Sequence, residues 1–97
     1  MAKQAIWVML KAKPGKENDV EAFLKQGAAM SLEEPQTVTW YGVKLGQGTY
    51  GVFDTFNDEE GRDAHLNGEI AKALMANAAD LFSNELKIEK MEILADK

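Results

Sequence analysis

The sequence predicts an α+β domain in which helices pack on one face of an antiparallel sheet. Its 97 residues leave room for a single domain that spans residues 1–97. Short apolar runs rich in β-branched and aromatic residues alternate with longer segments whose apolar residues recur at helical spacing. The resulting order of strand, helix, strand, strand, helix and strand is the ferredoxin-like split βαβ arrangement.

The first half of the domain starts with a strand and a helix. Residues 5–10 (Ala-Ile-Trp-Val-Met-Leu) are apolar without a gap, which fits a buried strand. Pro14 and Gly15 then signal a turn. From Lys16 the apolar residues fall on one helical stripe, and the helix must end before Pro35 because a residue that precedes proline is biased away from helical geometry. The stripe consists of Val20, Phe23, Leu24, Gly27 and Ala28.

A hairpin is predicted in the middle of the chain. Residues 37–45 and 49–56 are both rich in β-forming side chains. The segment Gly46-Gln47-Gly48 makes a tight connection between them.

The second half of the domain is expected to add a helix and a last strand. The helix starts at 57–60, with Asn57 or Asp58 as its N-cap. Residues 76–82 continue helically, either after a kink or as a separate short helix, and the final strand covers 86–94. The buried stripe of this helix consists of Leu66, Ile70, Ala73 and Leu74.

Both faces of the predicted sheet carry large apolar side chains, although helices cover only one face. Trp7 and Met9 alternate with Ile6, Val8 and Leu10, and Tyr41, Val43 and Leu45 alternate with Val38 and Trp40. Something must therefore cover the face without helices. We expect a second identical sheet to do so, in a face-to-face homodimer with an isologous interface.

Composition excludes several classes of function. The 11 Lys and Arg against 16 Asp and Glu give a net charge of −5, which argues against a nucleic-acid partner. With no cysteine, the chain has no disulfide, thiol nucleophile, iron–sulfur cluster or cysteine-type zinc site. A single histidine excludes a metal site built mainly from imidazoles. No cofactor and no metal are expected.

Membrane and nucleotide signals are weak or missing. No apolar run approaches the roughly 20 residues that span a bilayer. Residues 1–4 do not read as a secretory signal, so a cytoplasmic protein without a membrane partner is expected. The glycines of 46–51 match a GxGxxG spacing, but they join hairpin strands instead of opening a helix, as a dinucleotide site requires.

Asp54 is the first candidate for chemistry, because it lies mid-strand among apolar residues. A carboxylate in a sheet face costs free energy unless it is paired or hydrogen-bonded. It could orient a base or a substrate hydroxyl. Alternatively, it pairs with Arg62 or a lysine, or lies near the rim of the dimer interface.

His65 is the second candidate, because only its unperturbed pKa allows proton exchange near neutrality. At helical spacing it shares a face with Glu69 and Lys72. It could be a catalytic base at the edge of a pocket between helix and sheet. Alternatively, it is a partly exposed helical histidine that caps a carbonyl group or pairs with Glu69.

The strand aromatics Trp7, Trp40 and Tyr41 could line a pocket for a flat apolar ligand. Alternatively, aromatic residues at alternating strand positions belong to the core or to an interface.

Several segments, spread over almost the whole chain, match the pattern of a known family. They are Lys13-Pro14-Gly15-Lys16, Thr39-Trp40-Tyr41-Gly42, Phe53-Asp54-Thr55-Phe56, Gly61–Gly68 and Lys87–Leu94. The sequence thus resembles the antibiotic biosynthesis monooxygenase family, and the strand–turn–helix segment around His65 is the most specific part of the match.

This resemblance implies a dimeric α+β barrel, with the two sheets face to face and a ligand pocket between sheet and helices in each subunit. Characterised members oxygenate polycyclic phenols or quinols without metal or flavin, or degrade haem. In the cofactor-free reaction an ionised phenol passes an electron to O₂ within an apolar pocket. His65 aligns with the family's common helix histidine, and Trp40 and Tyr41 could form an aromatic wall.

The chain also departs from the family pattern. Haem-degrading relatives carry an Asn in the first strand, where this chain has Trp7, Val8 and Met9. They also carry a haem-ligating His further along the second helix, and none stands near Met75. Haem degradation is therefore not expected. The Trp common at the end of the third strand is Phe56 here.

The resemblance and the candidate residues together lead us to expect a cofactor-independent monooxygenase that uses O₂ on a small aromatic phenol or quinol. His65 would be the base or a hydrogen-bond partner, Asp54 or Arg62 would orient the ligand, and Trp7, Trp40 and Tyr41 would contact it. The alternative is a non-enzymatic dimeric protein of the same fold that binds a small ligand or has a stress-related role.

Overall fold

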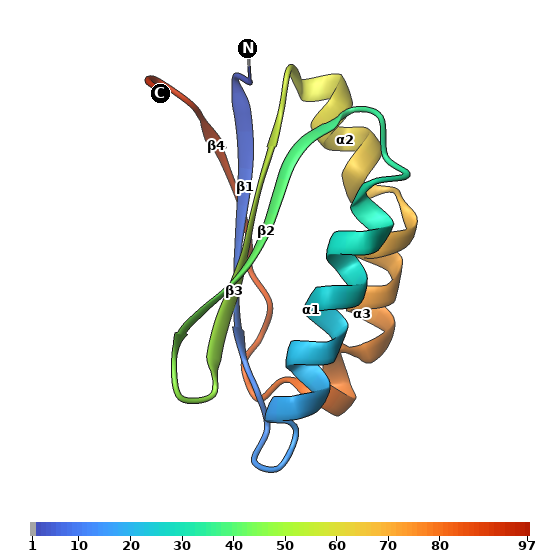
Figure 1. Cartoon of the computed structure of the whole chain (residues 1–97), viewed down its shortest axis with the longest axis vertical. Helices are drawn as coiled ribbons and strands as arrows, with labels where there is room; N and C mark the ends of the chain where they lie inside the picture. The colour runs from blue at the N-terminus through green and yellow to red at the C-terminus, as the bar shows by residue number, and fades with distance from the viewer. Residues whose placement is uncertain (1) are drawn as a thin grey trace.

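The computed structural model describes residues 2–97 and has the predicted α+β, ferredoxin-like architecture (Figure 1). Strands β1 (Gln4–Lys11), β2 (Thr37–Gly46), β3 (Thr49–Phe56) and β4 (Ile88–Glu92) form one antiparallel sheet in the order β2-β3-β1-β4. Helices α1 (Glu17–Ser31), α2 (Glu59–Leu66) and α3 (Glu69–Leu81) all cover the same face of this sheet. Within 2–97, none of the helices has the length and apolar character needed to cross a bilayer.

The core lies between the helices and the covered face of the sheet. Alternation along the strands places one set of apolar side chains there, because successive residues of a strand point to opposite faces. This set includes Ile6, Val8 and Leu10 of β1 and Tyr50, Val52 and Phe56 of β3. Val20 and Leu24 of α1 pack against them, as the predicted helical stripe requires, whereas Ala28 is exposed.

Trp40 of β2 packs beneath α1 because the helix has a glycine at the point of contact. A Cβ at Gly27 would lie 2.9 Å from the Trp40 ring, closer than carbon atoms pack. The glycine thus lets the helix approach the sheet over a large side chain.

The prediction of one helix whose buried stripe runs from Leu66 to Leu74 was wrong, since the helix breaks at Asn67 and Gly68. Asn67 ends α2 by donating its Nδ2 hydrogen to the Asp63 carbonyl oxygen at 2.9 Å, and Gly68 is the N-cap of α3. Of the two predicted N-caps of α2, Asp58 is the one used, because its side chain accepts a hydrogen bond from the Gly61 amide at 2.8 Å. The last strand is shorter than the predicted 86–94.

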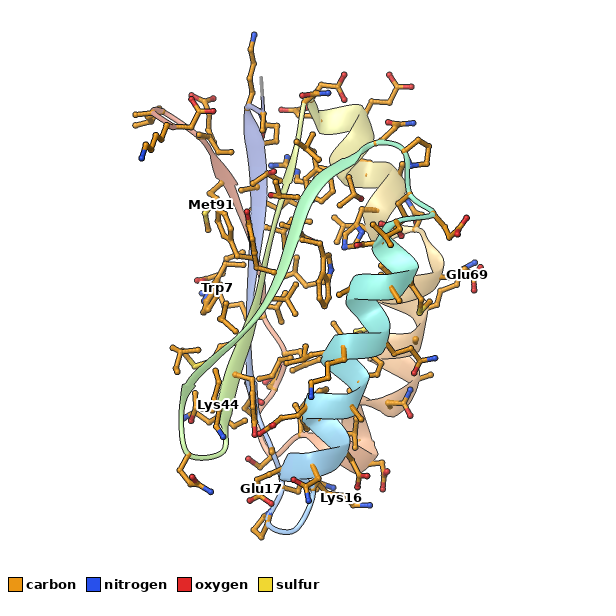
Figure 2. All side chains as sticks on the ribbon, in the orientation of Figure 1. Trp7, Lys16, Glu17, Lys44, Glu69 and Met91 are labelled. Atoms are coloured by element: carbon orange, nitrogen blue, oxygen red, sulfur yellow. The ribbon has the colours of Figure 1, made fainter. Side chains whose placement is uncertain are left out.

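The opposite face of the sheet has no helix over it and is apolar. Trp7 and Met91 project from this face, away from the helices (Figure 2). Trp7 is paired with Phe53 across the β1–β3 ladder, and Tyr41 is paired with the same Phe53 across the β2–β3 ladder. Met9, Tyr41, Val43, Leu45 and Met91 are among the exposed large apolar residues of the chain. The sequence predicted this apolar open face.

The ring of Trp7 lies over Gly51, and this contact can be tested by adding one methyl group. A Cβ at Gly51 would overlap the Trp7 ring, whereas a Cβ at Gly46 in the same hairpin would meet no atom within 4 Å. We expect Gly51→Ala to lower the free energy of unfolding by about 1–3 kcal/mol through overpacking. Gly46→Ala should change it by less than about 0.5 kcal/mol. Urea unfolding followed by circular dichroism, at equal protein concentration, measures both. Equal stability of the two variants would contradict this placement of Trp7.

Candidate functional site

The candidate site is built around His65, the chain's single histidine, near the end of α2. Its side chain is 7% exposed and lies between two carboxylates. Nδ1 is 2.7 Å from Glu34 Oε1, and Nε2 is 2.8 Å from Asp54 Oδ2. The three residues come from the segment between α1 and β2, from β3 and from α2, so the fold brings together groups that are far apart in the sequence.

Asp54 reaches His65 because of its place in β3. It shares the helix-covered face with Val52 and Phe56, since all three alternate along one strand. A short connection after Phe56 returns the chain over the sheet as α2, and the Phe56 and His65 rings lie with their centroids 5.3 Å apart. Asp54 is 1% exposed, and neither of its oxygens has a well-directed hydrogen bond. The nearby imidazole is therefore the charge partner that stabilises this carboxylate.

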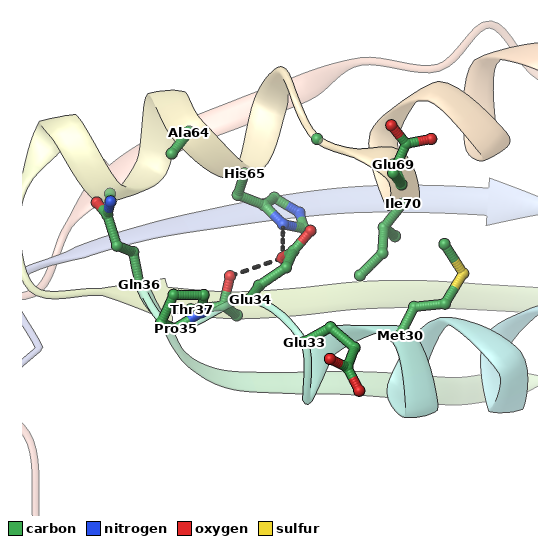
Figure 3. Close-up of a pocket in the computed structure, with 12 residues that line it drawn as sticks. Met30, Glu33, Glu34, Pro35, Gln36, Thr37, Ala64, His65, Glu69 and Ile70 are labelled. Carbon is green, nitrogen blue, oxygen red and sulfur yellow. Dashed lines mark hydrogen bonds and ion pairs between the residues drawn. The ribbon is translucent and has the colours of Figure 1, made fainter.

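Glu34 holds the other side of the imidazole. Its Oε1 accepts hydrogen bonds from His65 Nδ1 at 2.7 Å and from Thr37 Oγ1 at 2.8 Å (Figure 3). A Cβ at Gly68 would lie 3.0 Å from Glu34 Oε2, so this oxygen lies at the start of α3. A helix N-terminus carries partial positive charge, which favours a carboxylate at this position.

These contacts change the proton affinity of His65. Burial alone would lower the pKa of its imidazole, because burial disfavours the charged form. The two carboxylates that flank the ring, Asp54 and Glu34, outweigh burial, and they raise the pKa of His65 above its usual 6.5. The imidazolium form, in which both ring nitrogens are donors, matches the two carboxylates that flank the ring.

A pocket of about 450 Å³ opens beside Glu34 and His65, between the segment that follows α1 and the α2–α3 junction (Figure 3). Met30, Pro35 and Ile70 supply apolar walls. Glu33 and Glu69 lie on opposite sides of it. A pocket of this size falls within the range of small-molecule sites.

A second, much smaller void of about 30 Å³ lies behind His65, between the sheet and the helices. Trp40 and Asp54 line this void, and His65 and Ile70 line both the void and the outer pocket. Because a cavity needs roughly 10–15 Å³ for each water molecule, the void is too small for an aromatic ring.

The structure does not bring all the predicted site residues together. His65 and Asp54 contact each other, and Trp40 lines the small void beside them. Trp7 belongs to the open face of the sheet. Tyr41 shares that face and also borders, together with Trp40, a groove between β2 and the end of α1.

Arg62 lies apart from both the pocket and Asp54. It is 9% exposed, and its guanidinium donates to Gln4 Oε1 at 2.8 Å. Asp54 therefore pairs with His65 and not with Arg62, contrary to one alternative.

The alternative of a partly exposed His65 paired with Glu69 was wrong. His65 is buried, and the helix break at Asn67 and Gly68 places Glu69 in a new helix. Glu34 is the carboxylate that contacts the histidine instead of Glu69. It lies 31 positions from His65, so helical or strand periodicity could not connect the two. Residues 2–97 contain no group of three or more side chains placed to hold a metal ion.

The raised pKa of His65 predicts a pH dependence of stability. Because folding raises this pKa, the protonated ring stabilises the folded state. That contribution is complete below pH 6.5 and is lost as the pH rises through the pKa of folded His65. We expect the free energy of unfolding to fall over this interval in the wild-type protein. His65→Gln should remove this slope, and Glu34→Gln should reduce it, as measured by urea unfolding from about pH 6 to pH 9. The same slope in wild type and His65→Gln would assign it to another group.

Comparison with known proteins agrees with this fold. No protein-family model matches the sequence, and no curated protein matches it. A crystal structure of a protein of unknown function from Nitrosomonas europaea is 52% identical, covers 100% of this chain and 94% of its own, and superposes with a TM-score of 0.95.

Two more distant structures carry names that refer to an activity. A candidate antibiotic biosynthesis monooxygenase from Caulobacter crescentus has 18% identity and a TM-score of 0.82, with 97% of this chain and 92% of that chain covered. Another, from Bacteroides thetaiotaomicron, has 17% identity and a TM-score of 0.77, with 96% and 90% covered. The protein therefore belongs to the family of the Nitrosomonas europaea protein and has the antibiotic biosynthesis monooxygenase-like fold that its sequence predicted.

Proposed function

We propose that the protein is a cofactor-independent monooxygenase that uses O₂ on a small aromatic phenol or quinol. The observation that supports this most is the position of His65, whose ring joins two carboxylates at the wall of the 450 Å³ pocket. Positioned imidazole and carboxylate groups are the usual acids and bases of enzymes. The structures named as candidate monooxygenases share the fold, which makes this chemistry a reasonable first test.

The proton transfer starts at Glu34. Its Oε1 already accepts two hydrogen bonds, so Oε2 is the oxygen that can accept a third from a substrate hydroxyl. The substrate proton passes to the Glu34–His65 pair when the imidazole is neutral, and Asp54 stabilises the imidazolium that forms. Asp54 thus orients His65, since it is buried behind the ring and does not line the outer pocket.

The oxidation requires no further electron donor. The ionised substrate gives one electron to O₂, and the two radicals combine into a hydroperoxide. One oxygen atom stays in the substrate as a carbonyl group. The other leaves as water with the two hydrogens that the substrate loses, so the substrate provides every electron.

One observation supports the non-enzymatic alternative. Both ring nitrogens of His65 are engaged by Glu34 and Asp54, and no aromatic side chain lines the outer pocket within residues 2–97. In this alternative the three residues stabilise the fold, and the pocket only binds its ligand.

Oxygen consumption with a panel of hydroquinones distinguishes the two functions. We expect turnover by the wild-type protein and a loss of about 10²-fold or more in His65→Gln, which removes the proton acceptor. Asp54→Asn should also lose activity, because the imidazolium is no longer stabilised. Val20→Ala, a buried truncation near the start of α1, controls for a general loss of stability. Absence of turnover in the wild type, or turnover that is unchanged in His65→Gln, would contradict the proposed reaction and favour the non-enzymatic binding protein.

We also propose that two copies associate through the open face of the sheet. Large exposed apolar side chains gather there, and Trp7 lies over Gly51 on this face instead of in the core. An apolar face of this kind costs free energy in water unless another surface covers it. A second copy of the same sheet is apolar at the same positions, as a two-fold interface requires.

Light scattering at micromolar concentration tests the dimer. Strand β2 offers a valine for the test variant and another valine for its control. Val43 lies on the open face, opposite Gly51, whereas Val38 borders the groove between β2 and α1. We expect the mass of a dimer for the wild type and for Val38→Lys. Val43→Lys should shift the mass toward the monomer, because it places a charge within the apolar interface. A monomeric wild type, or equal effects of the two lysines, would contradict this arrangement.

A further inference from the structure

We propose that the pocket beside His65 selects its ligand by charge and takes an aromatic molecule that carries a protonated amine, in preference to a carboxylated or phosphorylated counterpart. This inference rests on the proposed function, because it assumes that the outer pocket is the ligand site, and it names the substrate class. It follows from the charges of the walls, from the start of α3 and from the shape of the pocket.

The walls of the pocket carry an excess of negative charge. Of residues 2–97, Glu33, Glu34 and Glu69 line it, and His65 is the only residue of basic type that does so. The imidazolium charge of His65 is already balanced by Asp54 and Glu34, both within 2.8 Å. Lys72 pairs with Glu69 at 3.5 Å, and both side chains are exposed, so this pair screens the charge of Glu69 only weakly. Within the described part of the chain, the pocket therefore offers carboxylates to a cation and no free cation to an anion.

The start of α3 is the one element of the pocket that could attract an anion. Its N-cap, Gly68, supplies no side-chain hydrogen bond to the first turn. Glu34 Oε2 lies close to Gly68 instead, so a carboxylate of the protein already compensates the partial positive charge of the helix end. A ligand carboxylate or phosphate would have to compete with Glu34, whose position is fixed by hydrogen bonds to His65 and Thr37.

The remaining walls fit an aromatic body. Met30, Pro35 and Ile70 are apolar, and Ala64 with Gly61 gives a wall of small residues along α2. The volume of about 450 Å³ accommodates a single ring with a short side chain. The ammonium group also has a chemical role, since it offsets the negative charge that forms when the ligand hydroxyl loses its proton to the Glu34–His65 pair.

Three phenols of nearly equal size test the inference, because they differ in the charge of one group. They are 4-(2-aminoethyl)phenol, 4-(2-hydroxyethyl)phenol and 4-hydroxyphenylacetate, titrated by calorimetry and by NMR shifts of the His65 ring and the Met30 methyl group. We expect the amine to bind about tenfold more tightly than the alcohol, and the carboxylate to bind most weakly. The preference should shrink as salt is added, since salt screens exposed charges.

Removal of one carboxylate locates the effect. Glu33→Gln should reduce the preference for the amine about threefold, whereas Glu85→Gln, a matched change of an exposed residue that does not line the pocket, should leave it unchanged.

Equal affinity for the three phenols, or tightest binding of the carboxylate, overturns charge selection and leaves the monooxygenase proposal standing. Preferential binding of the amine without oxygen consumption by amine-bearing hydroquinones supports charge selection and contradicts the monooxygenase. Failure of all three phenols to bind overturns both.

Discussion

The structure around the site depends on a single buried imidazole that is held between two carboxylates. Burial of a charge in a protein interior costs several kcal/mol unless a partner compensates it. Folding must therefore bring His65, Asp54 and Glu34 into contact together. His65 closes the contact between α2 and β3 through Asp54, and between α2 and the segment after α1 through Glu34. Removal of one partner leaves a buried charge without compensation. His65 thus connects the helix layer to the sheet, and together with Glu34 it forms one wall of the outer pocket.

Glycines allow the two tryptophans to occupy opposite faces of the same sheet. Trp40 fits between the sheet and α1 because Gly27 has no side chain, and Trp7 fits on the open face because Gly51 has none. The helix-covered face is thereby filled, which reduces the space behind His65 to a void of about 30 Å³. The space for a ligand lies instead outside this core, where the chain leaves α1 and passes the α2–α3 junction. Core packing thus determines from which side a ligand can reach the imidazole.

Much of the fold could be predicted from local patterns, because strand alternation and helical spacing are visible in single segments. Alternation along β3 places Asp54 on the helix-covered face, and the position of His65 next to Leu66 predicts its closeness to the core. The break at Asn67 and Gly68 was missed, because the apolar spacing of Leu66 and Ile70 suits one continuous helix as well as two.

The part played by Glu34 could not be predicted for a different reason. Its neighbours Glu33 and Pro35 look like the end of a helix, and its real partner is 31 positions away. Glu34 contacts the imidazole only because the folded chain places α2 over β3, next to the segment that follows α1. The same return decides that the pocket is lined by carboxylates and not by the strand aromatics.

The contacts that stabilise His65 also oppose its use as a base. A histidine that is protonated between two carboxylates favours the folded state, but it can accept a substrate proton only after it has lost its own. The raised pKa therefore makes stability and basicity depend on pH in opposite directions. A higher pH increases the fraction of neutral imidazole, but it weakens the interaction of α2 with β3 and Glu34. In the reaction proposed above, a ligand hydroxyl at Glu34 would change this balance, because the proton that it provides would restore the imidazolium. In that reaction we expect the folded state to be most stable when the ligand is ionised and His65 is protonated. The negative charge that forms on the ligand then lies next to the carboxylates of the pocket, which disfavour it.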